Sequence, residues 1–516
     1  MKNTLMRNYL RTAGFLAVFA FTPITACTDL TEVPESSIAP DHFYTNEAEI
    51  LGGLASVYAQ LRITVEAYYD VSEVTSDEII VPTRGTDWYD NGKWLDLDRQ
   101  TFGANSPAGL DNINAAWNQL FTGVARANVV LEAIEGTAFP STPVVQAELR
   151  TLRAFYYYLL QDLFGGVPIV EETSIAARPR ATRAEVFAYI ESELNAARAV
   201  LPASWPANMN GRLTSGAADA MLASLYLNAE VFTGTVTAAG LQRGAPRWQD
   251  AITAVDRIIG SPQYSLATNW RSNFTANNNT SPEIIFAVKF VAVDGLGLNF
   301  LMRAIHYNQY DATTPWNGFA TIAETYAKFD PDDSRRQIFL AGPQVNLITN
   351  NPVNDRAGNP LVFDPNIPDP TQASEGAGVR IAKWPVDPAH VAQHNGNDFA
   401  HYRLAEILLI KAEALNELSA ANVPQAVALI NQVRARHFAT PEPVAATTQA
   451  QVRTLIMNER LYELTAESKR RTDLIRLGGW GATWFNKTAS EPYKVLMPIP
   501  QTQLGTNPEL VQNAGY

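Results

Sequence analysis

Apolar residues recur every three or four positions along several stretches of this 516-residue chain. In residues 146–164, for example, Leu149, Leu152 and Tyr156 begin a stripe that continues to Leu163. This spacing predicts an α-helix, because a helix turns once every 3.6 residues. The same period predicts further helices over 183–200, 217–230, 248–259, 402–418 and 424–437.

The predicted helices fall into pairs. Glycine and proline separate 146–164 from 183–200, and Pro424 suits the start of the helix that follows 402–418. Small residues stand where paired helices would touch, while the spacing between pairs is irregular. We therefore predict a mostly α fold, a degenerate array of tetratricopeptide-type hairpins in one compact body. Residues 65–110 and 266–400 lack the helical period and are predicted to be rich in loops, with short strands such as 283–290.

The predicted helix over 402–418 is amphipathic. Three leucines share one face, and Glu406, Glu413 and Glu417 share the opposite face, which we expect to meet solvent. Lys411 falls near the apolar stripe, so its ammonium group must reach water or find a partner.

The net charge is −13, which argues against nucleic acid as a partner, because binding phosphates requires clustered Lys and Arg. The densest basic run, 469–471, is interleaved with Glu463, Glu467 and Asp473 at helical spacings. That pattern predicts a helix face with local salt bridges.

The N-terminus has the organisation of a secretory signal. Three basic residues precede a short apolar run over 13–21, too short to span a bilayer, and Ala26 leads into Cys27. Cys27 is the only cysteine in the chain, and its setting resembles a bacterial lipobox. We predict that residues 1–26 are a signal peptide, that Cys27 carries the lipid anchor, and that residues 28–40 form a tether.

Several motifs, in their order and spacing, resemble the SusD/RagB family. They are residues 153–168 (with YYYLLQDLFGGVP), 178–186 (RPRATRAEV), 216–218, 402–417 (YRLAEILLIKAEALNE), 429–436 (LINQVRAR), 459–478 (ERLYELTAESKRRTDLIRLG) and the ending 497–516. The resemblance covers almost the whole chain. It implies a SusD-like fold with an N-terminal region over 27–230 and a C-terminal region over 265–516.

The resemblance also implies a function. Members of this family are outer-membrane lipoproteins that face the cell exterior, capture oligosaccharide or polysaccharide, and deliver it to a SusC-like TonB-dependent transporter, without catalysis and without a cofactor. Two alternatives stay open: a peptide-capturing RagB-like lipoprotein, and an envelope scaffold of helical repeats with no small ligand. A third, a cryptic glycosidase, needs two carboxyl groups across a cleft, and the sequence selects no such pair.

No motif for metal or nucleophilic chemistry is complete. His390 and His394 are four residues apart, with His401 following, but Val391 stands where a zinc protease needs glutamate. We interpret these histidines as ordinary loop residues. Asp364, with two further oxygen-bearing residues, does not complete a calcium loop. No metal site is predicted.

Two clusters of aromatic and polar residues are candidates for ligand binding. Sugars present apolar faces and hydroxyl edges, so a site needs flat aromatic rings beside carboxylates, amides or guanidinium groups. The first cluster, in residues 75–94, contains Asp77, Arg84, Asp87, Trp88, Tyr89 and Trp94. The second, in residues 307–317, contains Tyr307, Asn308, Gln309, Tyr310, Asp311, Trp316 and Asn317.

We predict that Trp88, Tyr89 and Trp94, with Trp316, form an exposed aromatic platform. Asp77, Arg84 and Asp87 would then bond sugar hydroxyls. The competing interpretation of each aromatic residue is core packing, in which case its removal lowers stability instead of affinity.

Overall fold

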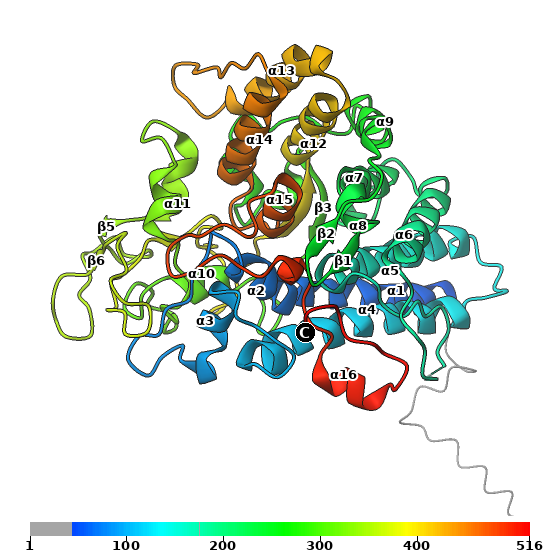
Figure 1. Cartoon of the computed structure of the whole chain (residues 1–516), viewed down its shortest axis with the longest axis horizontal. Helices are drawn as coiled ribbons and strands as arrows, with labels where there is room; N and C mark the ends of the chain where they lie inside the picture. The colour runs from blue at the N-terminus through cyan, green and yellow to red at the C-terminus, as the bar shows by residue number, and fades with distance from the viewer. Residues whose placement is uncertain (1–43, 175) are drawn as a thin grey trace, which may run out of the picture. The chain divides into compact units, whose positions relative to one another are not determined.

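The computed structural model describes residues 44–174 and 176–516, which are mostly helical (Figure 1). The predicted signal peptide, Cys27 and the tether lie outside these residues. The helices are α1 (Glu47–Gln60), α2 (Ala67–Val74), α3 (Lys93–Asp98), α4 (Asn114–Ala133), α5 (Thr142–Phe164), α6 (Arg183–Arg198), α7 (Ser215–Leu227), α8 (Ala229–Phe232), α9 (Trp248–Ile259), α10 (Phe300–Ala304), α11 (Ala323–Ala327), α12 (Leu404–Leu418), α13 (Val423–Arg434), α14 (Gln449–Leu464), α15 (Arg470–Leu477) and α16 (Gln501–Thr506).

The strands are short and pair in twos. They are β1 (Thr235–Thr237), β2 (Gly240–Gln242), β3 (Ile284–Val288), β4 (Phe339–Leu340), β5 (Gly342–Pro343), β6 (Val362–Phe363), β7 (Arg380–Ile381) and β8 (Phe399–Arg403). The antiparallel pairs are β1 with β2, β3 with β8, β4 with β7, and β5 with β6. The strand predicted within 283–290 is β3, and its partner β8 comes from more than 100 residues further along the chain.

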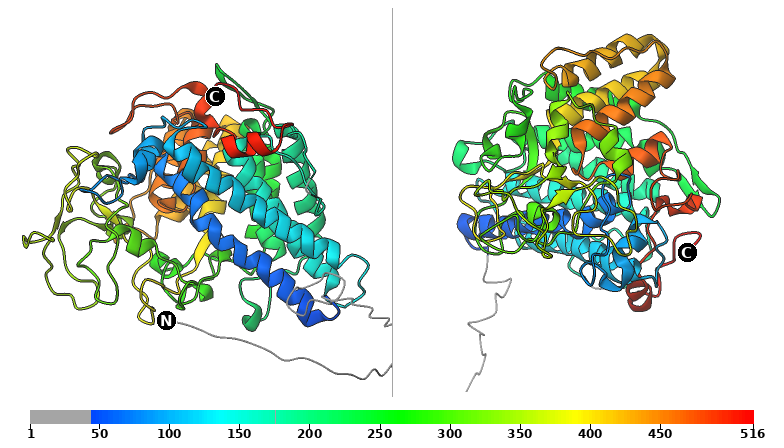
Figure 2. Two further views of the ribbon diagram at one scale, coloured as in Figure 1. Left: turned by 90° about the horizontal axis from the view of Figure 1, so that it is seen from below. Right: turned by 90° about the vertical axis from the view of Figure 1, so that its left-hand side faces the viewer.

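The predicted helical hairpins are confirmed. Helix α5 packs on α6, α7 packs on α9, and α12 packs on α13. Further contacts of α4 with α5, α6 with α7 and α9 with α12 join these pairs into a continuous array, and the left view of Figure 2 shows α1 running beside α4. Local signals define the ends: Thr182 and Glu185 form a capping box at the start of α6. The expected mostly α class, built from helical hairpins, is therefore correct.

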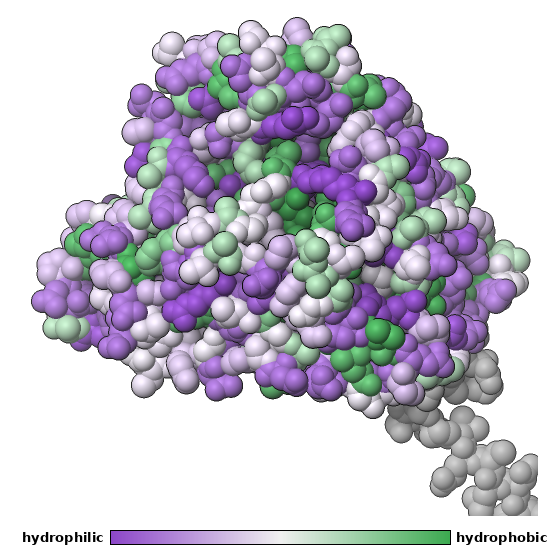
Figure 3. Space-filling view, in the orientation of Figure 1, coloured by the Kyte–Doolittle hydropathy of each residue, from purple (hydrophilic) through white to green (hydrophobic). Residues whose placement is uncertain are grey.

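The apolar faces of these helices meet in a large hydrophobic cluster that extends from Ile50 in α1 to Leu510 near the C-terminus. By their contacts, Tyr44–Tyr516 form one compact unit. The division into regions at 230 and 265 stays a prediction. Within the described residues, no helix combines the length and apolarity that crossing a membrane requires. Hydrophilic and hydrophobic residues are interspersed over the face drawn in Figure 3.

Helix α12 differs from its prediction in two ways. It begins at Leu404 and not at 402, because the two preceding residues belong to β8. Glu406 and Glu413 do not face solvent but are buried. Helices α9, α13 and α14 all pack on α12, so little of its surface is left for water.

The buried glutamates of α12 are paired with cations. Glu406 lies 3.1 Å from the ammonium group of Lys469, and Glu413 lies 2.6 Å from the guanidinium group of Arg476. Lys411 finds the partner that its position demands, Asp256 of α9. The prediction that these glutamates face solvent is therefore wrong. A carboxylate that is buried and paired with a cation occupies the same position in a helical pattern as one that faces water, so the sequence pattern does not distinguish the two.

The basic run 469–471 does form salt bridges, but not with its neighbours in sequence. Arg470 binds Asp77 at 2.6 Å, and Arg471 binds Asp162 at 2.7 Å. Both arginines are buried. The run therefore connects the C-terminal helices to the N-terminal third of the chain through buried ion pairs and does not form a solvent-exposed helix face.

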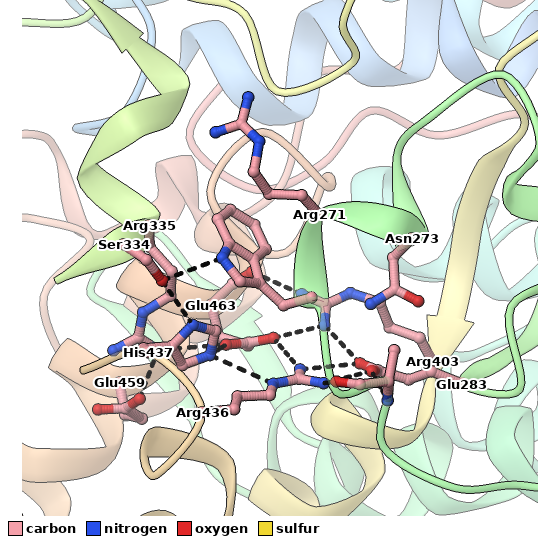
Figure 4. A network of polar contacts seen from close by, with 12 residues as sticks. Arg271, Asn273, Glu283, Ser334, Arg335, Arg403, Arg436, His437, Glu459 and Glu463 are labelled. Carbon is pink, nitrogen blue, oxygen red and sulfur yellow. Dashed lines mark hydrogen bonds and ion pairs between the residues drawn. The ribbon is translucent and has the colours of Figure 1, made fainter. Parts of the chain in front are cut away.

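A buried network of ion pairs lies where β3, β8 and α14 meet (Figure 4). Arg403, from β8, contacts Glu283 at 2.9 Å and Glu463 at 2.5 Å. Glu463 also accepts hydrogen bonds from Arg436 at 2.8 Å and Arg335 at 3.2 Å. Residues separated by more than 100 positions thus share one polar centre.

The network keeps its charges despite burial. Burial alone would raise the pKa of Glu463, but the nearby guanidinium groups of Arg403 and Arg436 hold that pKa well below its ordinary value. For a histidine, burial acts in the opposite direction: it lowers the pKa of His437, and the contact of its imidazole with Glu463 at 2.8 Å offsets this only in part. Each carboxylate therefore depends on the arginines that face it.

We predict that Arg403→Met destabilises the protein by about 3–5 kcal/mol, because it leaves buried carboxylates without their partner. The matched control is Arg453→Met, since Arg453 pairs with Glu417 on the surface and is about half exposed. That change should cost about 1 kcal/mol or less. Denaturant titration measures both free energies of unfolding. Equal losses for the two variants would contradict the structural role assigned to the network.

Candidate functional site

The structure brings the two predicted clusters together. Residues 84–94 begin with a tight turn in which Arg84 and Asp87 exchange two backbone hydrogen bonds, and Gly85 there has a φ of +64°. Three of the next four residues, Trp88, Asp90 and Asn91, also have positive φ. Such a conformation costs side chains other than glycine about 1–3 kcal/mol, so the surroundings must enforce it.

Trp88 is held by the second cluster. Its indole N–H donates to the carbonyl oxygen of Trp316 at 2.6 Å, and its ring meets the edge of Phe319 with centroids 5.6 Å apart. Gly318 makes this fit possible, because a Cβ there would lie 2.3 Å from the indole ring. The indole therefore fixes the geometry between residues 84–94 and the segment after α10.

Polar side chains border the aromatic residues. Asp87 accepts a hydrogen bond from the Tyr307 hydroxyl at 2.5 Å and contacts Arg356 at 3.3 Å. The guanidinium group of Arg356 also lies 4.1 Å from the centroid of the Tyr307 ring and pairs with Glu375. Figure 1 shows the segments that contribute these residues, around α3, α10 and the loop between β5 and β6, on its left side.

The electrostatics of this border follow from its pairs. Burial, together with the hydrogen bond to Asp87, raises the pKa of Tyr307 to about 12, so its hydroxyl keeps its proton as a donor. Burial would raise the pKa of Glu375, but hydrogen bonds from Arg356 and His306 hold it at about 2. The border thus presents a neutral phenol, a guanidinium group and the ionised carboxylate of Glu375.

We call the accessible part of this surface the aromatic rim. Tyr89 is the most exposed member, at 59%, and Arg356 is also exposed. Trp88, Tyr307, Trp316 and Asp87 are half-buried. Sequence reasoning missed Arg356, Glu375 and His306, since an arginine in a loop of Asn, Asp and Gly carries no signal for a partner almost 270 residues away.

Three residues predicted to contact ligand are buried structural residues. Asp77 is bound by Arg470 and Lys328, and its pKa falls to about 2 despite burial. Arg84 donates to the carbonyl oxygens of Asn317 and Ala377, each at 2.8 Å, and is 1% exposed.

Trp94 is 5% exposed, packs edge to face on Trp88 and Phe319, and donates to Asp90 at 2.7 Å. Asp77 and Arg84 are buried because residues 75–84 are not a surface loop. Ile80 bridges Ala320 through the interior, and Ile79 and Val81 are buried beside it. The polar residues of this stretch therefore serve partners inside the protein.

The interpretation of the three histidines as ordinary loop residues is wrong for His401. His394 lies near a turn and contacts Asp294, as a loop residue would. His401 belongs to β8, where it is buried between Phe155 and Phe286 and close to the hydroxyl of Thr64. Among the residues that the structure describes, no three His, Cys, Asp or Glu side chains are grouped so that they could hold a metal ion.

We predict that Trp94→Ala lowers the free energy of unfolding by about 3–5 kcal/mol, as for other large buried side chains. Tyr89→Ala, five positions away and exposed, should change it by about 0.5 kcal/mol or less. Thermal and denaturant unfolding of the two variants makes the comparison. A small effect at Trp94 would mean that its indole lies on the surface after all.

Comparisons with known proteins agree on one family. The SusD family model matches residues 325–490, and a model described as "Starch-binding associating with outer membrane" matches residues 52–227. A SusD-like protein of Formosa agariphila is 26% identical, with 97% of this chain and 98% of that protein covered. The starch-binding protein SusD of Bacteroides thetaiotaomicron is 26% identical, with 76% of each chain covered.

Solved structures share the fold. A laminarin-binding SusD-like protein superimposes with a TM-score of 0.72 at 23% identity, covering 92% of this chain and all of that one. Surface glycan-binding protein A from Bacteroides thetaiotaomicron, in complex with laminarihexaose, gives a TM-score of 0.68 at 19% identity, covering 90% of this chain and 99% of that one. With matching models in both halves and relatives along almost its whole length, the chain belongs to the SusD/RagB family.

Proposed function

We propose that this protein captures an oligosaccharide or polysaccharide outside the cell at the aromatic rim. The observation that carries the proposal is the rim itself. The exposed ring of Tyr89 and the half-buried rings of Trp88 and Trp316 come from the two segments that meet there, and Asp87 with its partner Arg356 supplies a carboxylate and a guanidinium group. Rings stack on the apolar faces of sugars, and the charged groups bond the hydroxyl edges.

The rim is rigid before any ligand arrives. Trp88 is fixed by its hydrogen bond to Trp316, and Asp87 is fixed by Tyr307 and Arg356. A preorganised site loses less conformational entropy on binding. The relatives named for binding starch and laminarin, and the structural neighbour that holds laminarihexaose, support a glycan as the ligand class.

The same geometry supports binding without turnover. A glycosidase needs one carboxyl group that holds a proton near neutral pH and a second carboxylate across the sugar. At the rim, Glu375 has a pKa of about 2 and its oxygens are already occupied by Arg356 and His306. It cannot serve as the acid.

We predict that Tyr89→Ala and Arg356→Ala each weaken binding at least tenfold, which is about 1.4 kcal/mol, because each removes a direct contact. Isothermal titration with laminarihexaose, maltohexaose and a panel of plant and algal oligosaccharides gives the affinities. Arg336→Ala is the matched control, since Arg336 also lies over a tyrosine ring, that of Tyr326, at 4.4 Å. Its binding should equal that of the wild type.

Other outcomes favour other functions. Saturable binding of peptide pools without any glycan binding would favour the RagB-like, peptide-capturing alternative. Glycan binding that neither rim variant changes would place the site elsewhere. Turnover of any polysaccharide in the panel would contradict a purely binding role.

We further propose that the protein is anchored in the outer membrane through a lipid on Cys27, faces the exterior, and delivers its ligand to a SusC-like TonB-dependent transporter. The model described as associating with the outer membrane supports the location. Cys27→Ala should leave a folded protein that no longer fractionates with membranes when the transporter gene is deleted. Gentle detergent extraction of the native protein should recover a large barrel through an extensive interface. Repeated recovery of the protein alone would favour the scaffold alternative.

A further inference from the structure

A cavity of about 150 Å³ lies between the segment joining α6 to α7 and the strand β3. Trp205 and Tyr264 form aromatic parts of its wall, and Asn210, Asn279 and Lys289 contribute polar groups. It shares no residue with the aromatic rim. In Figure 1, α6 and α7 lie to the right and α3 and α10 to the left.

Trp205 is held in place by an arginine. The guanidinium carbon of Arg212 lies 3.9 Å from the centroid of the indole ring, and the indole N–H donates to the carbonyl oxygen of Leu213 at 2.8 Å. Arg212 is itself fixed by Glu148, whose side chain is fully buried, with Nε at 3.1 Å from the carboxylate. Glu148 also accepts a hydrogen bond from Tyr58 at 2.5 Å.

This arrangement is unusual for a surface connection. The residues around Trp205, from Pro206 to Asn210, are exposed, yet a fully buried carboxylate ultimately fixes the orientation of this one ring. Gly211, with a φ of +97°, allows the segment to approach, because a Cβ there would lie 2.7 Å from the side chain of Lys289. The ring is therefore preorganised at the cavity wall, as a stacking surface for a ligand should be.

The charges around the cavity cancel. Arg212 is neutralised by Glu148, and Lys289 is neutralised by Asp398. The polar groups left to bond a ligand are uncharged. The amide N–H of Asn210 already donates to the backbone of Asn279, whereas the Asn279 side chain is exposed. A neutral ligand rich in hydroxyl groups fits this set better than an anion, which would find no unpaired cation.

We propose that this cavity is a second carbohydrate site, separate from the rim, which takes a single neutral sugar ring stacked on Trp205 and bonded by the amide of Asn279. The size supports one ring. Cavities for larger ligands usually measure about 300–1,000 Å³, well above the 150 Å³ present here. A chain end or branch of a polysaccharide would occupy it while the rim holds another segment.

The test is saturation-transfer NMR on the mature protein with glucose, galactose, mannose, xylose and N-acetylglucosamine, and with glucuronate as the anionic counterpart of glucose. At least one neutral sugar should bind, and it should still bind to the Tyr89→Ala variant, in which the rim contact is removed. Trp205→Ala should weaken it at least tenfold. Asn279→Ala, which removes only an exposed side chain, should weaken it severalfold and serves as the deciding variant if Trp205→Ala unfolds.

Several results would overturn the proposal. They are no saturation transfer from any sugar of the panel, binding that Tyr89→Ala abolishes, and binding that both cavity variants leave intact. Tighter binding of glucuronate than of glucose would contradict a neutral ligand. Because the rim is tested by its own variants, failure here leaves the proposed capture at the rim unaffected.

Discussion

Arg403 and the three buried glutamates around it, Glu283, Glu463 and Glu467, are the constraint on which the rest of the structure depends. Burying this many charges is favourable only if every partner arrives in the correct geometry. Arg403 belongs to β8 and Glu463 to α14, while Glu283 directly precedes β3 and Glu467 follows α14, so the centre cannot form until these segments meet. Neutral His437 closes it on one side. The network thus links segments of the C-terminal half of the chain that lie up to 184 positions apart, from Glu283 to Glu467, more specifically than apolar packing could.

Buried polar contacts also position the aromatic rim. Asp77 is bound by Arg470 of α15, and Arg84 is bound by carbonyl groups near residue 317 and in the loop 374–377. These interior contacts fix the N-terminal end of the segment that carries Trp88 and Tyr89, and the buried Trp94 fixes its C-terminal end. A loop with three positive φ values outside glycine can then persist, because its ends cannot relax. Buried charge in the scaffold is therefore what makes the rim rigid.

At the rim and at the cavity, a tryptophan is held in place in the same way. At the rim, Trp88 is fixed by the carbonyl oxygen of Trp316, and at the cavity Trp205 is fixed by that of Leu213. In both places an arginine lies over an aromatic ring and is paired with a carboxylate. The two arginines differ in exposure. Arg356 at the rim is exposed, whereas Arg212 at the cavity is paired with a fully buried glutamate. The proposed roles, hydroxyl bonding at the rim and a neutral sugar ring in the cavity, rest on that difference.

The sequence by itself determined the helices, their pairing and the family, because helical period, capping residues and breakers are local properties that the chain carries wherever it folds. It also located both clusters that meet at the rim. Only the tertiary structure decided which of their members face solvent. Asp77, Arg84 and Trp94 lie in the same stretch of sequence as the exposed Tyr89. Their burial depends on partners up to 393 positions away. Burial is a property of what the rest of the chain covers, so no local pattern can reveal it.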